Sequence, residues 1–335
     1  MAVDILKSYP RLWTLEEGTA MVVTDLHGDW DAYERYRDRF ASLHDSGQAD
    51  YLIFTGDLIH AENPKKDKSL EIISDILALR LTYGEAIIVL CGNHELPHIY
   101  SITLAKGDRH FTPDFEKALS QSEWREEITS LFHALPFYIR TRAGVSLTHA
   151  GAPAIVAEPD RAIALFNWRH RRLLDWATQI MSQEDIPTLR QGYSRLNQDL
   201  PYDMLAKYFL AVSGPDDPRY DDLLRGFIAT SHPDFEALLW PALFTRCEQE
   251  YGLADHRIFV DALLQALSTE FSAQNFLVTG HITIKGGHET VTKQHLRLAS
   301  AHHATPRRAG QYLLFDTSSP VDSITTLVNQ LGTVF

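Results

Sequence analysis

The sequence is poor in cysteine, with only Cys91 and Cys247 among 335 residues. Two cysteines provide neither a disulfide framework nor the spacing of a zinc knuckle. No apolar run approaches the roughly 18 residues of a membrane-spanning helix, and the opening residues, MAVDILKSYP, lack the basic and apolar regions of a signal peptide. We therefore expect a cytoplasmic protein in a reducing environment, with no membrane partner.

Positive charge is also scarce, because 31 Lys and Arg residues face 44 Asp and Glu residues, which gives a net charge of −13. This balance disfavours non-specific attraction to nucleic acid, so no nucleic-acid partner is expected, while a local site for phosphate is still allowed. Low-complexity segments and internal repeats are missing as well. Apolar residues make up 44% of the chain, which is enough for a sizeable core.

Short apolar strands alternate with helical segments in the first half of the chain. The first predicted strands are AMVVTD, YLIFTG and AIIVLCG. This β-α-β-α-β order indicates a parallel or mixed sheet with helices on its faces, which is an α/β class of fold. Strand patterns stop at about residue 158 and return after residue 272. We expect a single domain, 1–335, with a helical insertion (cap) at 158–272.

Side chains of metal-ligand type follow five of the predicted strands, usually beside a glycine. They are Asp25 and His27, Asp57, Asn93 and His94, His149, and His281. In open α/β sheets the ligand site lies beyond the carboxyl ends of the strands, so residues far apart in sequence converge there. Carboxylate oxygens, imidazole nitrogens and an amide oxygen suit manganese, iron or zinc rather than metals that prefer thiolates.

The number of ligands points to two metal ions. Six of these seven side chains, with only two carboxylates, are already too many for one tetrahedral zinc. They fit two ions that share a bridging carboxylate, roughly 3.5–4 Å apart, which clamp the attacking and leaving oxygens of a phosphoryl displacement. Asp25 and His27 both reach past one strand end to the same ion, and Gly28 lets the backbone turn immediately afterwards.

Five motifs in this order, DLHGD, GDLIH, GNHE, THAG and GHI, resemble those of the metallophosphoesterase (calcineurin-like) superfamily, and most closely its phosphoprotein-phosphatase branch. The resemblance covers residues 20–155 and 276–316. It implies a mixed-sheet core, built as a two-sheet sandwich flanked by helices. It also implies a phosphatase that uses two divalent or trivalent ions to hydrolyse phosphomonoesters, with a phosphorylated small molecule or a phosphopeptide as substrate.

The resemblance also implies a role for each residue. The first ion is expected to bind Asp25, His27 and Asp57. The second ion is expected to bind Asp57, Asn93, His149 and His281. His94 binds no metal and protonates the leaving alkoxide, while a hydroxide held between the ions attacks phosphorus. Asp57 and His94 are therefore the residues expected to act in catalysis.

The second motif departs from the pattern of that family. The family motif usually continues into Asp-Arg-Gly, where Asp partners the acid His and Arg grips the phosphate. Here the sequence reads GDLIHAEN, which places His60 and Glu62 in this stretch and no Arg. Support for His94 then falls to Glu95, Glu62 or His60, and the sequence does not choose among them. Arg246 and His60 are the candidates for substrate binding.

Three other functions compete with a phosphomonoesterase. An aspartyl-phosphate phosphotransferase needs a second Asp two residues after the first, where this chain has His27, so this class is rejected. A phosphodiesterase or a dinucleoside-polyphosphate hydrolase would use the same metals. A non-catalytic scaffold of the same fold is the third alternative, and the intact ligand set together with His94 argues against it.

The position of the insertion suggests what it covers. It leaves the sheet after His149 and returns before His281, which are two expected ligands of one ion. We therefore expect residues 158–272 to roof the cleft, and small phosphomonoesters or flexible phosphopeptides to be preferred over folded phosphoproteins. By the family resemblance, His302 and His303 lie near the mouth of the site, although a surface loop explains them equally well.

Overall fold

Two mixed β-sheets form the centre of the protein in the computed structural model, which describes residues 5–335. The smaller sheet has the strand order β16-β15-β3-β4-β5. Its strands are β3 (Thr19–Val23), β4 (Tyr51–Phe54), β5 (Ile87–Val89), β15 (Gln311–Asp316) and β16 (Leu331–Thr333). β3, β4 and β5 run parallel, and β15 lies antiparallel to both β3 and β16.

The larger sheet has the order β1-β2-β8-β9-β10-β13-β12. Its strands are β1 (Ile5–Tyr9), β2 (Leu12–Leu15), β8 (Tyr138–Thr141), β9 (Val145–Thr148), β10 (Phe276–Thr279), β12 (His288–Thr292) and β13 (His295–Leu298). Two short pairs lie outside these sheets: β6 (Ala105–Lys106) with β7 (Arg109–His110), and β11 (Ile284–Lys285) with β14 (Ala304–Thr305). β1 and β2 were not among the strands expected from the sequence.

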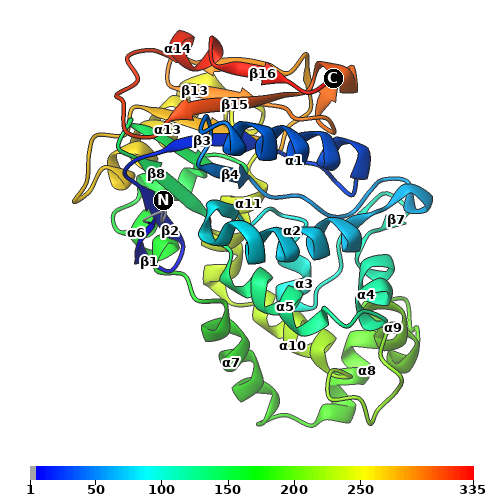
Figure 1. The fold of residues 1–335 in the computed structure, drawn as a ribbon. Coiled ribbons are helices and arrows are strands. Elements are labelled where there is room, and N and C mark those ends of the chain that lie inside the picture. The colour runs from blue at the N-terminus through cyan, green and yellow to red at the C-terminus, as the bar shows by residue number, and fades with distance from the viewer. Residues whose placement is uncertain (1–4) are drawn as a thin grey trace.

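Side-chain alternation along the strands builds two separate layers of core. Val22 and Ile53 of the smaller sheet share one apolar cluster with Leu147 and Val278 of the larger sheet. The neighbours of Val22 and Ile53 along their strands face the opposite way, as period-two geometry requires, and pack under helices α1 (Trp30–Asp45) and α2 (Ser69–Tyr83). Figure 1 shows these two helices beside β3 and β4. The predicted sandwich of two mixed sheets flanked by helices is confirmed.

Three short helices, α3 (Leu96–Tyr100), α4 (Thr112–Ser120) and α5 (Arg125–Ala134), follow β5, and α14 (Ile324–Val328) lies near the C-terminus. Residues 158–272 are all described and contain helices and connecting segments but no strand. Their helices are α6 (Arg161–Phe166), α7 (His170–Met181), α8 (Ile186–Leu196), α9 (Tyr202–Leu210), α10 (Asp222–Thr230), α11 (Trp240–Phe244), α12 (Glu248–Tyr251) and α13 (Leu253–Leu267), with a π-helical turn at Phe235–Leu239.

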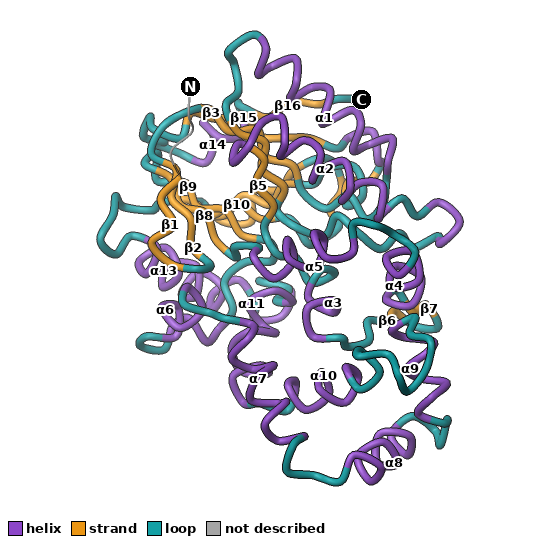
Figure 2. The backbone as a smooth tube through the Cα atoms, turned by 60° about the horizontal axis from the view of Figure 1, so that its bottom comes forward, coloured by secondary structure: helices purple, strands orange, loops and turns teal. Residues whose placement is uncertain are grey.

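The middle of this helical segment extends away from the sheets. Figures 1 and 2 both show α7, α8, α9 and α10 on the side of the molecule farthest from the two large sheets. α9 packs against α4, so the segment also contacts the helices that follow β5. Within residues 5–335, no helix combines the length and the apolar character that crossing a bilayer requires.

Candidate metal centre

The strand ends bring the predicted site residues together. Asp25 and His27 follow β3, Asp57 follows β4, Asn93 and His94 follow β5, His149 follows β9, and His281 follows β10. His27, Asp57 and His281 have positive φ angles of 46°, 52° and 67°. Non-glycine residues adopt this left-handed conformation at a cost, which the surrounding structure must offset. The strained backbone aims these side chains at a common point.

Two glycines beside the motifs make the close approach of the side chains possible. A Cβ atom at residue 92 would collide with Asp57 Oδ1 and Glu95, and one at residue 280 would collide with Asp25 Oδ2. Glycine is needed at both positions because another part of the site occupies the space of its side chain. The glycines that follow these strands are therefore required for the site carboxylates to occupy their positions.

Asp57 lies between two groups of potential ligands. Its Oδ1 accepts a hydrogen bond of 2.8 Å from the backbone N–H of His94. Its Oδ2 lies 3.6 Å from His27 Nε2 on one side and 3.5 Å from His149 Nε2 on the other. One group of ligand atoms contains His27, Asp57 and His94, and a second contains Asp57, His149 and His281. Asp57 is common to both groups.

The hydrogen bonds of His149 leave an acceptor facing other acceptors. Its Nδ1 lies 3.0 Å from the carbonyl oxygen of Thr55, which can only accept, so Nδ1 carries the proton. The lone pair of Nε2 then faces Asn93 Oδ1 at 2.9 Å and His281 Nδ1 at 3.1 Å. Convergent acceptors of this kind suit a cation. The hydrogen bond to Thr55 fixes the orientation of the ring, as the hydrogen bond to the non-coordinating nitrogen of a metal-binding histidine does.

Two buried atoms on the other side of Asp57 have no hydrogen-bond partner. They are Asp25 Oδ1 and His27 Nε2. Asp25 Oδ2 is held by the backbone N–H of His281 at 2.9 Å, so the carboxylate is fixed in place while Oδ1 makes no hydrogen bond. A buried polar atom without a partner costs free energy, which a bound cation would recover. The donor set on both sides of Asp57 therefore fits a pair of metal ions.

The electrostatic environment agrees with this interpretation. Burial, together with neighbouring His149, lowers the pKa of His281 to about 3, and burial also lowers the pKa of His27 and His149. These rings are therefore neutral and can coordinate a metal. Burial, Glu95 and Asp25 raise the pKa of Asp57 well above its ordinary value. A carboxylate placed there needs a nearby positive charge to ionise readily.

The candidates for supporting His94 occupy different positions. Glu95 accepts hydrogen bonds of 2.9 Å from the backbone N–H groups of Asp57, Leu58 and Gly92, so it ties together the loops after β4 and β5. Glu62 is exposed and pairs with Lys106 at 2.7 Å. His60 is fully buried, and its Nδ1 lies 3.1 Å from Nδ1 of His94. Of the three, His60 is the residue whose side chain contacts that of His94.

A cavity of about 240 Å³ opens over these residues. Its lining includes His27, Asp57, Asn93, His94 and His281, together with residues from 104–111 and 302–303. No lining residue comes from 158–272, so the prediction that the insertion roofs this cleft is wrong. The chain between α3 and α4 forms the β6–β7 hairpin, and this hairpin occupies the space instead. The insertion supports it from behind, where Phe209 of α9 stacks on His110.

Arg246 differs from its sequence-based placement, whereas His302 and His303 line the cavity, as the family resemblance implied. Arg246 is exposed and does not line the cavity, and its guanidinium donates to Gln249 Oε1 at 3.0 Å. It is close enough to contribute to lowering the pKa of His281. His303, which was not among the expected ligands, has Nδ1 only 3.4 Å from Asp25 Oδ1. The doublet AHHAT was the available signal, but its spacing does not match that of the motifs.

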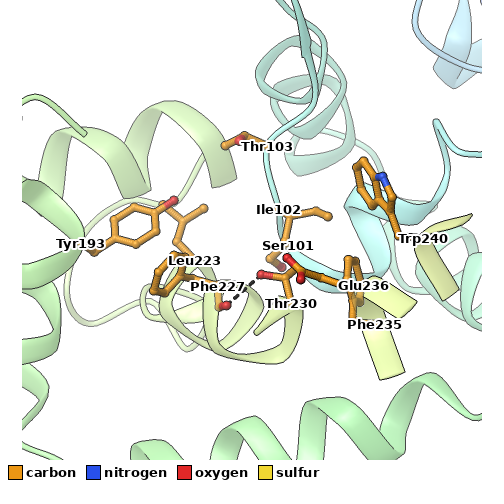
Figure 3. Close-up of a pocket in the computed structure, with 10 residues that line it drawn as sticks. All are labelled: Ser101, Ile102, Thr103, Tyr193, Leu223, Phe227, Thr230, Phe235, Glu236 and Trp240. Atoms are coloured by element: carbon orange, nitrogen blue, oxygen red, sulfur yellow. Dashed lines mark hydrogen bonds between the residues drawn. The ribbon is translucent and has the colours of Figure 1, made fainter. Parts of the chain in front are cut away.

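A second and larger cavity holds none of these residues. It measures about 570 Å³ and lies between the chain at 101–103 and the helical segment, lined by aromatic side chains such as Phe227 and Trp240. Figure 3 shows these side chains and a single hydrogen bond among them. The larger cavity lacks metal-ligand side chains apart from Glu236, so cavity size alone does not locate the site.

Comparison with known proteins gives one family match and several more distant ones. Residues 18–225 match the model of the calcineurin-like phosphoesterase family. The symmetrical bis(5'-nucleosyl)-tetraphosphatase of Nitrosococcus oceani is 30% identical over 131 residues, which cover 39% of this chain. The match spans 43% of the length of that relative.

Two solved structures resemble the whole chain at low sequence identity. A protein serine/threonine phosphatase from Saccharomyces cerevisiae aligns over 91% of this chain and 76% of its own, with a TM-score of 0.50 and 12% identity. A cold-active protein tyrosine phosphatase aligns over 91% of this chain and 75% of its own, with a TM-score of 0.47 and 15% identity. The first of these similarities supports the fold alone.

Proposed function

The chain belongs to the calcineurin-like phosphoesterase family, and from this premise we propose that it is a metal-dependent hydrolase of phosphoric esters, namely a dinuclear-metal phosphatase acting on phosphomonoesters. The observation that carries the proposal is the position of Asp57 Oδ2, at 3.6 and 3.5 Å from nitrogens of His27 and His149. One carboxylate oxygen placed between two sets of ligands is what a bridged pair of ions requires.

The remaining ligands divide about this carboxylate. Asp25 and His27, with Asp57, are proposed to hold one ion. Asn93, His149 and His281, with Asp57, are proposed to hold the other. When bound, manganese, iron or zinc would supply Lewis acidity that neutralises the phosphoryl oxygens and favours ionisation of an attacking water.

His94 is proposed to serve as the general acid. Its side chain lines the cavity, and its Nε2 lies 3.9 Å from Asp57 Oδ2, so this nitrogen faces the place where a phosphoryl group would sit. A ring in that position can give a proton to the leaving oxygen as the bond to phosphorus breaks. Its backbone N–H already holds Asp57, so the acid and the bridging ligand are positioned together.

The phosphate contact that the second motif lacks is proposed to come from the rim of the cavity. Arg246 would have to exchange its hydrogen bond to Gln249 for one to the substrate. Lys106 already lines the cavity, 76% exposed and paired with Glu62, and is a second source of positive charge. Because neither is a preformed bidentate clamp, the metals would hold most of the phosphate charge.

A dinucleoside-polyphosphate hydrolase is the second candidate. It is favoured by the partial match to the Nitrosococcus oceani tetraphosphatase, which covers less than half of that protein. The same ligands would serve both reactions, since each displaces an oxygen from phosphorus. The two functions differ in the leaving group and in how much of the substrate must extend outside the cavity.

A substrate panel separates the two candidates. With added manganese, we expect a higher kcat/KM on small phosphomonoesters and short phosphopeptides than on phosphodiesters or a dinucleoside tetraphosphate. The control is His281→Ala, prepared identically, which should lose activity on every substrate and so exclude a contaminating hydrolase. Faster turnover of the dinucleoside tetraphosphate would replace the proposed function with the second candidate.

A further inference from the structure

A line of hydrogen-bonded rings leads from His94 into the interior of the protein. His94 Nδ1 lies 3.1 Å from His60 Nδ1, and His60 Nε2 lies 2.8 Å from His98 Nε2. His98 Nδ1 in turn lies 2.8 Å from Glu116 Oε1. We call His94, His60, His98 and Glu116 the histidine relay. Its members come from the loops after β4 and β5 and from helices α3 and α4.

The inner end of the histidine relay is a fixed carboxylate. Glu116 Oε2 accepts hydrogen bonds from Arg125 at 3.0 Å and from Arg219 at 2.8 Å. Burial opposes ionisation of this group, yet the hydrogen bond to His98 and the charge of Arg219 hold its pKa below the ordinary value. Glu116 is therefore an anion that only accepts hydrogen bonds. Arg219 belongs to the helical insertion, which thus anchors the relay.

The carboxylate sets the direction of every hydrogen bond in the relay. Because Glu116 only accepts, His98 Nδ1 must donate to it. When each ring carries one proton, His98 Nε2 then accepts from His60 Nε2–H, and His60 Nδ1 accepts from Nδ1–H of His94. This leaves Nε2 of His94, the nitrogen on the Asp57 side, free to face the cavity.

Aromatic side chains enclose the middle of the relay. Phe111 stacks on the ring of His60 at 5.6 Å with an interplanar angle of 21°, and Phe115 meets the ring of His98 edge-on at 4.7 Å. His60 is fully buried, and its backbone N–H donates to Ser69 Oγ at 2.7 Å. Hydrogen bonds in such water-poor surroundings are stronger and better oriented than those at a surface.

We propose that His60, His98 and Glu116 are positioning residues that hold His94 for proton transfer to the leaving group. The proposal rests on the phosphatase activity proposed above. In the step, the bond from phosphorus to the leaving oxygen breaks, and that oxygen keeps the bonding electron pair. It takes the proton from Nε2 of His94, which the ring has taken up from solvent beforehand and which makes it cationic, and the ring then keeps only its Nδ1–H, directed at His60. The relay thus does the work that a carboxylate in direct contact with the acid would do.

The test replaces Glu116 without emptying its site. Glu116→Gln keeps the shape but allows the amide to donate to His98, which removes the reason for the direction of the relay. We expect kcat for an alkyl phosphate such as phosphoserine to fall by about tenfold to a hundredfold, the usual range for partners behind a site residue. For 4-nitrophenyl phosphate, whose leaving group needs little protonation, kcat should change much less. KM should stay the same for both.

Glu126→Gln is the matched control. Glu126 is exposed on α5 next to Arg125, one of the two arginines that bind Glu116, and it contacts no member of the relay. This substitution should leave kcat unchanged for both the alkyl and the aryl phosphate. Equal losses on the alkyl and aryl substrates after Glu116→Gln would mean a structural role only. No loss on the alkyl phosphate would overturn the proposal as well.

Combining Glu116→Gln with a substitution of His60 tests whether Glu116 acts on His94 through His60. His60→Asn keeps an acceptor oxygen where Nδ1 stood but is too short to reach His98, and asparagine tolerates the φ of +74° at this position. In this background, adding Glu116→Gln should not change the ratio of alkyl to aryl turnover further. The same added loss as in the parent protein would show that Glu116 acts by another route.

Nitrogen-15 spectra of the histidine rings in the zinc-loaded protein test the relay without any activity measurement. We expect the proton on Nδ1 of His98, on Nε2 of His60 and on Nδ1 of His94. A proton on Nδ1 of His60 would overturn the assigned direction even if every variant misfolds. If the parent protein hydrolyses no phosphomonoester while the spectra show the expected pattern, the proposed function fails and the hydrogen-bond relay stands.

Discussion

Asp57→Asn should remove more bound metal than any other single substitution at the site, and should lower phosphomonoesterase activity by roughly a thousandfold. The metal ions supply several kcal/mol of transition-state stabilisation, and each 1.4 kcal/mol is a factor of ten in rate. Asp57 Oδ2 lies within 3.6 Å of His27 Nε2 and 3.5 Å of His149 Nε2. Its replacement by an amide weakens both ion sites at once, because an amide carries no charge.

The same substitution should not unfold the protein. Burial, Glu95 and Asp25 disfavour the charge on Asp57, so a neutral asparagine relieves repulsion in the metal-free state. We therefore expect the metal-free variant to melt no earlier than the metal-free parent. The measurement is metal content by mass spectrometry together with thermal melting, with Asp25→Asn and His281→Ala as comparisons. Full metal occupancy after Asp57→Asn would exclude the bridging role.

His94→Ala should separate metal binding from chemistry. The ring of His94 is not among the proposed ligands, and the backbone N–H that holds Asp57 remains in the variant. We expect two bound ions and a loss of about 10²–10⁴ in kcat on an alkyl phosphate, the usual contribution of a general acid. On an aryl phosphate, the leaving group departs without a proton, so the loss should be much smaller.

The readout is the ratio of the two losses, because a general disturbance of the site would slow both substrates alike. His232→Ala in the helical segment, a half-buried residue that does not line the cavity, serves as a control for histidine removal. If His94→Ala reduces turnover of both substrates equally, His94 is not the acid. If metal content also falls, the ring contributes to binding after all.

The sequence was most informative where local rules decide the structure. Apolar strands that end on a polar residue beside glycine predicted that Asp25 and Asp57 would lie together, because parallel strands direct their carboxyl ends to one edge of the sheet. His281 joins them from β10 of the other sheet of the sandwich. Gly92 and Gly280 show the physical reason, since any side chain there would collide with a site carboxylate. The alternation of strands and helices likewise predicted a parallel or mixed sheet with helices on its faces, and the family resemblance implied the sandwich.

The parts that sequence reasoning missed depend on contacts between distant segments. No spacing rule relates His60, His98 and Glu116, which meet only because α3 and α4 pack beside the loop after β4. The hairpin at 105–110 covers the site although its residues carry no motif. The insertion was misplaced because the positions of its two ends at the site do not determine the direction in which its helices extend.

Addition of manganese to metal-free protein, with bound ion and phosphomonoester hydrolysis followed together, tests the central claim most directly. The arrangement of ligands about Asp57 predicts that hydrolysis rises with the second equivalent of ion and levels off near two ions per chain. A chelator should reverse the activity. Full activity with one ion per chain, or two tightly bound ions without any hydrolysis of phosphomonoesters, would contradict the account.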